Sequence, residues 1–371
     1  MKIGIDAREF LSGRMTGIGR YLWHFLQHAT TSKNPHEYVL FCNQETKIPF
    51  DLSKLKTVII REKITPIWDQ ILLPLNIAKE KIDVFLTPYI KAPFFLPSNM
   101  ILIINDLIPL FFPEEHGLFK RLYFRFMSGR SARRAKRIIT ISENSKDDIV
   151  KFFRLHTDKI MVVHLGVEER FRSPDIRIEE IRKKYTLPQK FILYLGNLSP
   201  HKNVQGLIKS YAVLPVNLRK QYKLVLGAPK SGKYFSYIEK VIREMELAQD
   251  VLFTGFIEEK DLPAVYHMSS LFAFPSFYEG FGLPPLEAMA CRCPVVSSNT
   301  SSMPEVLGDA AFFFDPYDVE EMSFAIRQML EGESLRDKFR QKGLERAKLF
   351  TFEKMTSRIL NVFESILAKK N

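Results

Sequence analysis

The sequence lacks an apolar run long enough to cross a membrane. A membrane-spanning helix needs roughly 18 consecutive apolar residues, and no stretch of the 371 residues approaches that length. The first residues, Met1 to Asp6, are typical of a β-strand, and Asp6 interrupts the apolar region that a signal peptide would need. We therefore expect a cytoplasmic protein.

Cysteine is also scarce. Cys42, Cys291 and Cys293 are odd in number and do not have the paired spacing of a zinc site. We expect all three to be reduced thiols in the core.

Acidic residues are too few to balance the basic ones. The chain has 54 Lys and Arg against 42 Asp and Glu, which gives a formal net charge of +12. The excess is concentrated between Leu118 and Arg137, where there is no acidic residue. The cations of this segment are Lys120, Arg121, Arg125, Arg130, Arg133, Arg134, Lys136 and Arg137. Large apolar residues are interspersed with them, namely Leu118, Phe119, Leu122, Tyr123, Phe124, Phe126 and Met127.

This segment, Leu118–Arg137, has two interpretations. A basic helix with large apolar residues fits an anionic membrane surface or an anionic lipid-linked acceptor. The alternative is a solvated basic face above an aromatic stripe that packs in the core. Nucleic acid also attracts basic patches, but no nucleic-acid-binding motif accompanies this one, so we expect no nucleic-acid partner.

The length and the 46% apolar content predict two domains, because the chain is too long for one ordinary core. Short apolar segments alternate with helical ones in both halves. Predicted strands are 2–6, 38–42, 57–60, 84–87, 100–105, 137–141, 191–195, 223–226, 251–253, 271–274, 295–297 and 311–314. Predicted helices are 19–29, 67–80, 118–135, 143–153, 204–214, 234–246, 260–268, 285–291, 303–307 and 319–331.

Such alternation predicts an α/β protein with parallel sheets that are covered by helices on both faces. We interpret the polar stretch 168–189 as the connection between two Rossmann-like domains, 1–172 and 173–351. Prolines confine 89–97 and 107–113 to loops. Ligands of such sheets lie beyond the carboxyl ends of the strands, so two sheets that faced each other would share one cleft.

The most informative stretch runs from Ser276 to Glu287. It follows an apolar strand, and its glycines, Gly280 and Gly282, let the backbone approach a ligand closely. Pro284 and Pro285 fit the first turn of a helix, and we expect Glu287 to lie in that turn. A glycine loop before a helix N-terminus binds anions.

Glu279 and Glu287 flank this loop, eight positions apart. A nucleotide sugar needs donors for its diphosphate and carboxylates that accept bonds from sugar and ribose hydroxyls. The alternative is a tight turn, with Glu287 only an acid favoured by the helix dipole. The two acids together with the two prolines favour the functional interpretation.

This stretch resembles the E-x7-E signature of retaining glycosyltransferases of the GT-B fold, specifically glycosyltransferase family 4. The resemblance covers nearly the whole chain and is strongest from Phe191 to Asp315. It implies two Rossmann-like parallel-sheet domains that face each other across a cleft. It also implies that 297–305 closes the donor pocket and that the final helix, within 352–371, packs back on the N-terminal domain.

The resemblance further implies roles for other residues. The segment from Asn197 to Asn203 follows a strand, and Lys202 would hold the donor diphosphate beside a helix N-terminus. An ordinary surface lysine next to an Asn203 cap is the alternative. The family often has an Arg-Lys pair here, where this chain has His201 and Lys202. The donor site would comprise Gly17, Gly19, Asn197, His201, Lys202, Glu279, Gly280, Phe281, Gly282, Leu283 and Glu287.

In the N-terminal half, Thr16 to Tyr21 resembles the family's glycine loop, although a Gly-x-Gly can equally be a plain turn. Asn105 and Asp106 stand where the family commonly has His-Asp near the transferred sugar. Asparagine forms hydrogen bonds but carries no proton. The family's retaining mechanism implies that the departing phosphate takes the acceptor's proton, so Asn105 could still position the sugar. The expected catalytic residues are Asn105, Asp106, Lys202 and Glu279.

The sequence contains no Asp-x-Asp, the pair with which metal-dependent glycosyltransferases hold a divalent cation. We therefore expect no metal and no other cofactor. The resemblance is strongest to bacterial mannosyltransferases of surface polysaccharide (lipopolysaccharide) synthesis. It implies transfer of a hexose to a glycan or lipid-linked acceptor, and the first expectation for the donor is GDP-mannose, which supplies mannose. It also implies that the protein is peripheral at the inner membrane face.

Two alternatives stay open. One is a nucleotide-sugar epimerase or phosphorylase on the same fold. The other is a degenerate accessory protein that binds a nucleotide sugar without turnover, suggested by Asn105 and His201.

Overall fold

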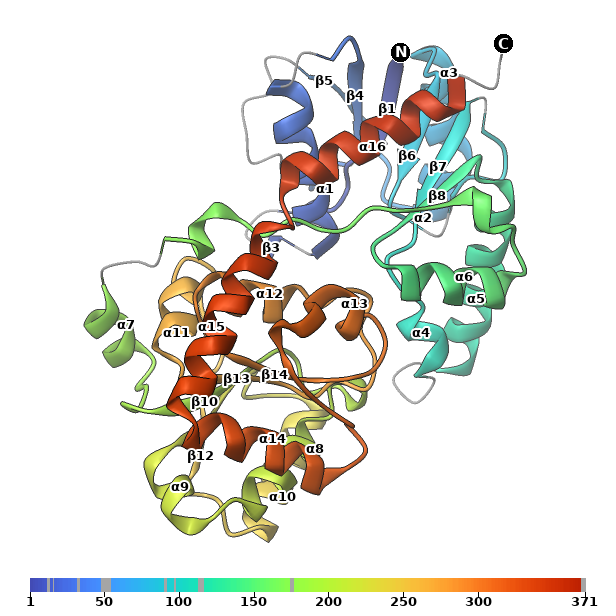
Figure 1. Cartoon of the computed structure of the whole chain (residues 1–371). Coiled ribbons are helices and arrows are strands. Elements are labelled where there is room, and N and C mark those ends of the chain that lie inside the picture. Colours follow the sequence, from blue (N-terminus) through green and yellow to red (C-terminus); the bar gives the residue numbers. More distant parts are fainter. Residues whose placement is uncertain are drawn as a thin grey trace. The chain divides into compact units, whose positions relative to one another are not determined.

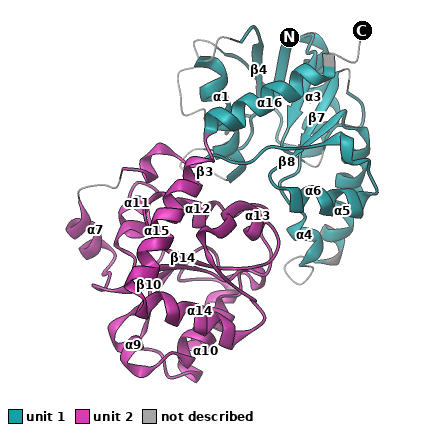
Figure 2. Cartoon of the chain, viewed as in Figure 1, with its two compact units in different colours: residues 1–166, 352–371 teal, residues 167–351 magenta. Residues whose placement is uncertain are grey.

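The structure is a computed structural model that describes residues 1–11, 14–15, 17–31, 34–47, 55–89, 92–96, 98–112, 117–173 and 177–367. The chain divides into two compact units (Figures 1 and 2). Unit 1 comprises Met1–Gly166 and Phe352–Asn371, and unit 2 comprises Val167–Thr351. Two parallel-sheet α/β domains were predicted, and this fold class is confirmed.

Unit 1 is built on a seven-stranded parallel sheet with the strand order β5-β4-β1-β6-β7-β8-β9. Its strands are β1 (Lys2–Asp6), β4 (Glu37–Cys42), β5 (Lys56–Ile59), β6 (Val84–Thr87), β7 (Asn99–Ile103), β8 (Arg137–Thr140) and β9 (Ile160–Val162). The central strands are nearly continuous apolar runs because both faces of a parallel sheet are covered. Two further strands, β2 (Phe10–Leu11) and β3 (Arg14–Met15), form a small antiparallel pair.

The helices of unit 1 cover both faces of this sheet. They are α1 (Gly17–Thr31), α2 (Thr65–Ile67), a π-helical turn η1 (Trp68–Leu72), α3 (Leu73–Lys79), α4 (Ile108–Phe111), α5 (Leu118–Arg134), α6 (Glu143–Phe153), a 3₁₀ turn η3 (Thr157–Lys159) and α16 (Phe352–Leu367). Leu40 of β4 packs in one core cluster with residues of α1 and α16, whereas its neighbours Val39 and Phe41 pack in a second cluster on the other face. This alternation follows from the period of two in a strand.

The C-terminal helix α16 lies beside α1 in unit 1 (Figure 1). Phe363 of α16 meets Phe25 of α1 edge to face, with ring centroids 5.9 Å apart. Phe352 stacks on His24 with ring centroids 3.6 Å apart. The C-terminal helix thus contributes to the core of the unit that contains the first strand.

Unit 2 has a six-stranded parallel sheet with the order β12-β11-β10-β13-β14-β15. Its strands are β10 (Phe191–Leu195), β11 (Lys223–Gly227), β12 (Val251–Phe253), β13 (Leu271–Phe274), β14 (Val295–Ser298) and β15 (Phe312–Phe314). Its α-helices are α7 (Ile178–Lys184), α8 (Val204–Val213), α9 (Val216–Gln221), α10 (Lys233–Glu244), α11 (Leu262–Met268), α12 (Leu283–Ala290), α13 (Met303–Leu307), α14 (Val319–Glu331) and α15 (Glu333–Lys348). Its 3₁₀ turns are η4 (Glu169–Phe171), η5 (Pro200–Lys202) and η6 (Gly308–Ala310).

The stretch 168–189 is not a plain connection, which corrects the prediction. The structure divides the chain after Gly166 rather than after residue 172, and the following residues belong to unit 2. Phe171 is fully buried, and its ring packs against Tyr266 with centroids 6.0 Å apart. Ile181 of α7 is also buried. The polar composition of the stretch 168–189 gave no sign that these two apolar residues are buried.

Several smaller differences follow from local chemistry. Residues 108–111 form the short helix α4 instead of a loop, because Pro109 fits the first turn of a helix. The sequence patterns missed β9, α9 and the long helix α15, whose exposed surface is highly polar. All three cysteines are free and buried, and burial raises the pKa of Cys42 to about 12. In the described part of the chain, no helix is both long and apolar enough to span a bilayer.

Candidate active site

The loops that follow β10 and β13 bring a lysine and a glutamate into contact. These two strands are neighbours where the strand order of unit 2 reverses, and ligands of such sheets bind beyond the strand ends at this point. Nζ of Lys202, in the first loop, lies 2.7 Å from Oε1 of Glu279 in the second. The side chains are only 16% and 11% exposed. An exposed surface lysine, the alternative considered for Lys202, does not describe this arrangement.

Lys202 and Glu279 each keep hydrogen-bonding groups that a ligand could use. The hydroxyl of Ser276 also donates to Oε1 of Glu279, at 2.6 Å. Within the described residues, Oε2 of Glu279 accepts no hydrogen bond, and Lys202 uses one of its three N–H donors. The pair can therefore accept a bond from a hydroxyl and donate two bonds to an anion.

Only glycine fits at position 282, because of both the backbone conformation and the neighbouring side chains. It has φ of +98°, and a Cβ there would lie 2.5 Å from the Met303 Cε. Gly280, by contrast, does not share the positive φ. Phe281 is buried and packs edge to face on Phe350, with centroids 5.7 Å apart, so its ring acts in packing. Leu283, the first residue of α12, is half-buried.

Glu287 does not lie in the first turn of a helix, contrary to the prediction. Helix α12 begins at Leu283 rather than at residue 285, and its first turn holds no acid. The prolines at 284 and 285 fit this turn because its N–H groups have no partner within the helix. Glu287 is 5% exposed, and its Oε2 accepts a bond from the Tyr266 hydroxyl at 3.1 Å. The helix-dipole alternative therefore does not explain this acid.

The loop between β10 and α8 is held by local bonds. The Asn197 side chain accepts from the Ser199 N–H at 3.0 Å, and its carbonyl accepts from the Tyr194 hydroxyl at 2.6 Å. Asn203 has φ of +52° and caps α8 by accepting from the Gly206 N–H at 3.2 Å. His201 is buried, and its carbonyl accepts from the Phe277 N–H at 2.8 Å. This last bond ties the Lys202 loop to the Glu279 loop.

A third loop, after β14, supports the Glu279 loop. The Ser302 hydroxyl donates to the carbonyls of Glu279 and Phe281, at 2.9 and 3.1 Å. The Glu279 N–H donates to the Ser301 hydroxyl at 3.0 Å. These bonds place part of 297–305 against the predicted donor loop.

In unit 1, Asn105 and Asp106 follow β7 at the carboxyl edge of the sheet. Oδ1 of Asn105 is buried and has no hydrogen-bond partner among the described residues. Such an orphan acceptor is costly unless a ligand or water satisfies it. Asp106 accepts from the Ile108 N–H at 3.0 Å and so supports the start of α4. Asn105 is therefore the better candidate for ligand contact.

The predicted glycine loop of unit 1 is helical. Gly17 and Gly19 lie in the first turn of α1, which begins two residues earlier than predicted, and neither has a positive φ. A Cβ on Gly17 would have open space. Thr16 lies outside the described residues.

Comparison with known proteins identifies the chain. Residues 15–171 match the family described as Glycosyltransferase Family 4, and residues 177–346 match Glycosyl transferases group 1. The O-antigen chain mannosyltransferase B of Escherichia coli is 30% identical over 98% of this chain and 100% of that protein. The chain belongs to glycosyltransferase family 4. The resemblance found in the sequence is thus confirmed.

Two other similarities accompany this family 4 glycosyltransferase assignment, one in sequence and one in fold. The serotype-specific mannosyltransferase WbdA of Escherichia coli is 30% identical over 73% of this chain, but over 34% of its own length. The crystal structure of HepE from Anabaena in complex with UDP has a TM-score of 0.77 at 18% identity, and covers 98% of this chain and 99% of HepE. At that identity the similarity shows the fold alone, which is the GT-B fold.

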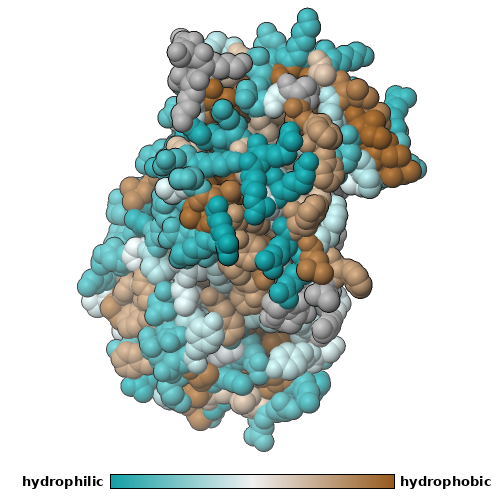
Figure 3. All heavy atoms as spheres, turned by 90° about the vertical axis from the view of Figure 1, so that its right-hand side faces the viewer, coloured by the Kyte–Doolittle hydropathy of each residue, from teal (hydrophilic) through white to brown (hydrophobic). Residues whose placement is uncertain are grey.

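The basic segment of the glycosyltransferase exposes most of its large apolar residues. Helix α5 carries Phe119 at 88% exposed, Phe126 at 64% and Leu122 at 52%, whereas Met127 is buried. The core-packing alternative is therefore wrong for the exposed residues. Beside the helix lies a groove of about 750 Å³ between Phe152 and Phe153 of α6 and arginines of α5, among them Arg125 and Arg133. The face of unit 1 with α4, α5 and α6 is turned to the viewer in Figure 3, where long hydrophilic side chains lie beside hydrophobic ones.

Some residues of the glycosyltransferase site were not found from the sequence. Ser276 begins the E-x7-E stretch and could have been noticed as a hydroxyl near Glu279. Tyr266 is 21 positions from Glu287 on another helix, and no spacing indicates their contact. Within the described ranges, no three His, Cys, Asp or Glu side chains are grouped as a metal site would require.

Proposed function

We propose that this glycosyltransferase transfers mannose from GDP-mannose to a glycan or lipid-linked acceptor in O-antigen synthesis. Its relatives of Escherichia coli that carry the name mannosyltransferase support the sugar and the acceptor class. The observation that carries the proposal is the contact between Lys202 and Glu279 at the switch point of unit 2. It unites a cation for a diphosphate with a carboxylate for sugar hydroxyls.

The diphosphate would be held without a metal. Lys202 can donate its two remaining N–H groups to phosphate oxygens, and a cation there stabilises the charge that develops on the leaving group. The sequence lacks the Asp-x-Asp pair that would recruit a divalent cation. In this chain, Lys202 would neutralise the diphosphate charge in place of a metal ion.

Glu279 and Glu287 would form hydrogen bonds with different parts of the donor. Glu279 would accept a bond from a mannose hydroxyl through Oε2, while Lys202 and Ser276 hold Oε1. Glu287 would accept bonds from the ribose, with the Tyr266 hydroxyl fixing its carboxylate. A carboxylate that is fixed by its neighbours loses little entropy when a ligand binds.

Transfer would proceed with retention. The bond from the mannose anomeric carbon to the phosphate oxygen breaks, and the acceptor oxygen bonds to the same face of that carbon. The acceptor's proton passes to the departing phosphate oxygen. No protein base is needed, so Asn105, which carries no proton, is compatible with this route. Its role would be to position the sugar through its orphan amide oxygen.

Helix α5 would hold the enzyme at an anionic membrane surface, where a lipid-linked acceptor resides. Exposed aromatic residues can enter the interface, and each cation near an anionic surface contributes about 1 kcal/mol. This arrangement accounts for apolar side chains that the core leaves exposed.

The test is turnover of GDP-mannose, measured as GDP release with and without a mannose-containing acceptor, with and without EDTA. We expect acceptor-dependent release that survives EDTA, and a product whose anomeric configuration by NMR matches that of the donor. Inversion would refute retention, and loss of activity that magnesium or manganese restores would refute metal independence. A free epimerised sugar would indicate an epimerase. Binding of GDP-mannose without any turnover would indicate the accessory role.

A further inference from the structure

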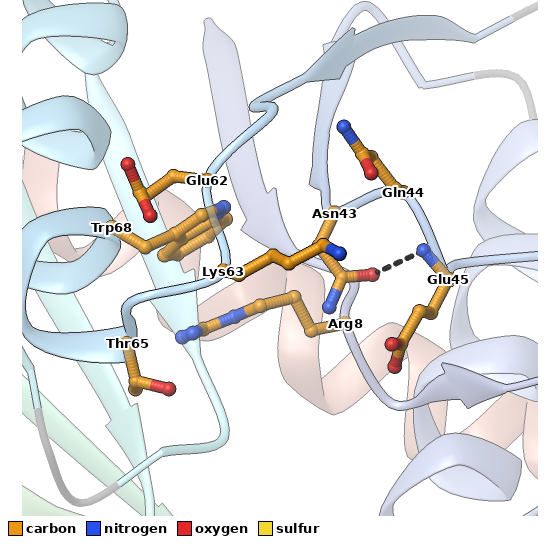
Figure 4. A pocket seen from close by; sticks show the side chains of 8 residues that line it. All are labelled: Arg8, Asn43, Gln44, Glu45, Glu62, Lys63, Thr65 and Trp68. Carbon is orange, nitrogen blue, oxygen red and sulfur yellow. Dashed lines mark hydrogen bonds between the residues drawn. The ribbon is translucent and has the colours of Figure 1, made fainter.

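A second pocket, of about 320 Å³, lies at the carboxyl edge of the unit 1 sheet (Figure 4). Three segments meet there: Arg8 follows β1, Asn43 to Glu45 follow β4, and Glu62 to Trp68 follow β5. The strand order of unit 1 reverses between β1 and β6, so the pocket adjoins the switch point of this sheet. Ligands of parallel sheets bind in this region.

Arg8 is held in one position from several sides. Its Nε and Nη2 donate to Asp6 at 2.9 and 2.7 Å, and its Nη1 forms an ion pair with Asp69 Oδ1 at 2.8 Å. Its guanidinium also lies over the ring of Trp68, 3.6 Å from the centroid, and 4.7 Å from that of Tyr89. The bonds to Asp6 use two of the five guanidinium N–H donors. The N–H groups of Nη1 and the second N–H of Nη2 form no hydrogen bond with a described residue and are available to a ligand.

The charge of the pocket disfavours an anion. Lys63 and Arg8 supply two positive charges, but Glu45 and Glu62 line the pocket and the Arg8 charge is already paired with two buried carboxylates. The other polar groups are the amides of Asn43 and Gln44 and the hydroxyl of Thr65. Groups that both donate and accept suit a neutral ligand with many hydroxyls, which is a sugar.

The pocket is displaced from Asn105 along the sheet edge. Asn105 follows β7, which is two strands from β1 and three from β4. Neighbouring strands are about 4.8 Å apart, so the displacement is roughly 10–14 Å. Reacting atoms must approach to about 3–3.5 Å. A sugar in this pocket therefore cannot be the one that reacts beside Asn105.

We propose that this pocket binds a sugar of the acceptor glycan that lies several bonds away from the reacting unit. The enzyme then favours acceptors that are several sugars long, because only these reach from Asn105 to Arg8. The inference rests on the proposed function, since it takes Asn105 to mark the reacting sugar. It adds a determinant of acceptor length, located in unit 1 alone.

The test fills the pocket mouth and leaves Arg8 and its carboxylates intact. Gln44→Trp and Thr65→Trp alter exposed positions of the lining, and Gln27→Trp on the exposed side of α1 is the matched control. The measurement is kcat/KM for mannotetraose relative to methyl mannoside. We expect this ratio to fall about tenfold in both pocket variants, as for the loss of one or two hydrogen bonds, and to stay at the parent value in the control. An equal ratio in all four proteins would overturn the proposal.

A binding experiment separates this proposal from the proposed function. Calorimetry with mannotetraose needs neither donor nor turnover. We expect the parent and Gln27→Trp to bind it, and Gln44→Trp to bind about tenfold more weakly. No binding by the parent, or equal affinity in the pocket variants, would overturn the pocket. If mannotetraose binds through the pocket while GDP-mannose is not turned over, the transferase proposal fails and the pocket stands.

Discussion

The two units share a sheet plan and differ in the chemistry at its edge. In each unit the first strand lies at the centre and the order reverses beside it, between β1 and β6 and between β10 and β13. At the unit 2 edge, Lys202 faces a single carboxylate and keeps two N–H donors. At the unit 1 edge, Arg8 is paired with Asp6 and Asp69, and Asn105 is uncharged. The same sheet plan thus carries a cation with unused donors at one edge and paired or uncharged groups at the other, because the chemistry of a site lies in the side chains at the strand ends.

This difference between the two sheet edges predicts that the two units bind different substrates. Under the proposed function, unit 2 would bind the charged diphosphate, and unit 1 would bind neutral hydroxyl groups and, through α5, a membrane surface. Changes in unit 2 should therefore act on donor use, and changes in unit 1 on the acceptor and on localisation.

Removing the unit 2 cation should have the largest effect. We expect Lys202→Ala to lower the transfer rate about 10²–10³-fold, the range found for single groups that stabilise developing charge. The measurement is the rate with saturating GDP-mannose and acceptor, with the melting temperature as a check on folding. Lys183→Ala, an exposed lysine in the same unit, is the control. Normal turnover by Lys202→Ala would show that the phosphate site lies elsewhere, and the difference proposed between the edges of units 1 and 2 would no longer hold.

Reversing charge on α5 should affect localisation and not the donor. We expect Arg125→Glu, Arg133→Glu and Arg134→Glu together to weaken binding to anionic vesicles roughly 100-fold, since three cations at about 1 kcal/mol each are lost. Added salt should weaken the parent in the same direction. Sedimentation with anionic and neutral liposomes measures this.

The control for α5 reverses Lys183, Lys220 and Lys338, three exposed lysines of unit 2. If both triple variants lose binding equally, net charge rather than this helix is responsible. Equal sedimentation of the parent with neutral and anionic liposomes would refute an electrostatic role.

Glu287→Ala should weaken donor binding to a smaller degree. A hydrogen bond to a charged group contributes about 1.5–3 kcal/mol, so the Kd for GDP should rise roughly tenfold or more. Calorimetry with GDP measures this directly, and Glu239→Ala, at a side chain of α10 that is 45% exposed, is the control. Unchanged affinity would show that Glu287 serves only the contact with Tyr266.

Asn105→His should have the smallest effect. Histidine keeps a hydrogen-bond donor and restores the residue that the family commonly has, so we expect transfer within about threefold of the parent or higher, which is within the worth of one hydrogen bond. The readout is kcat at saturating donor. A loss of more than tenfold would show that the amide itself is required.

The strands were the most predictable part of the molecule. The segments 2–6, 84–87, 191–195, 251–253 and 271–274 were predicted with the bounds that the structure has, because buried parallel strands are continuous apolar runs. The glycine loop before α12 was predicted as well. Its helix start was misplaced by two residues, since prolines are tolerated at more than one position of a first turn.

Contacts between distant segments could not be predicted. The pairing of Lys202 with Glu279 spans 77 positions, and that of Tyr266 with Glu287 joins two helices. The exposure of Phe119 and Phe126 was equally undetermined, because an aromatic residue in a basic helix is compatible with core or surface.

The order of apolar and polar residues by itself determined that this chain forms two parallel-sheet domains, since strand and helix periodicities are local properties. The motif residues determined the family. Only the tertiary structure decided which side chains meet at the strand ends, because these contacts depend on the strand order of each sheet. That order brings Lys202 to Glu279 in unit 2, and it aligns Arg8, Tyr89 and Asn105 along one edge of unit 1.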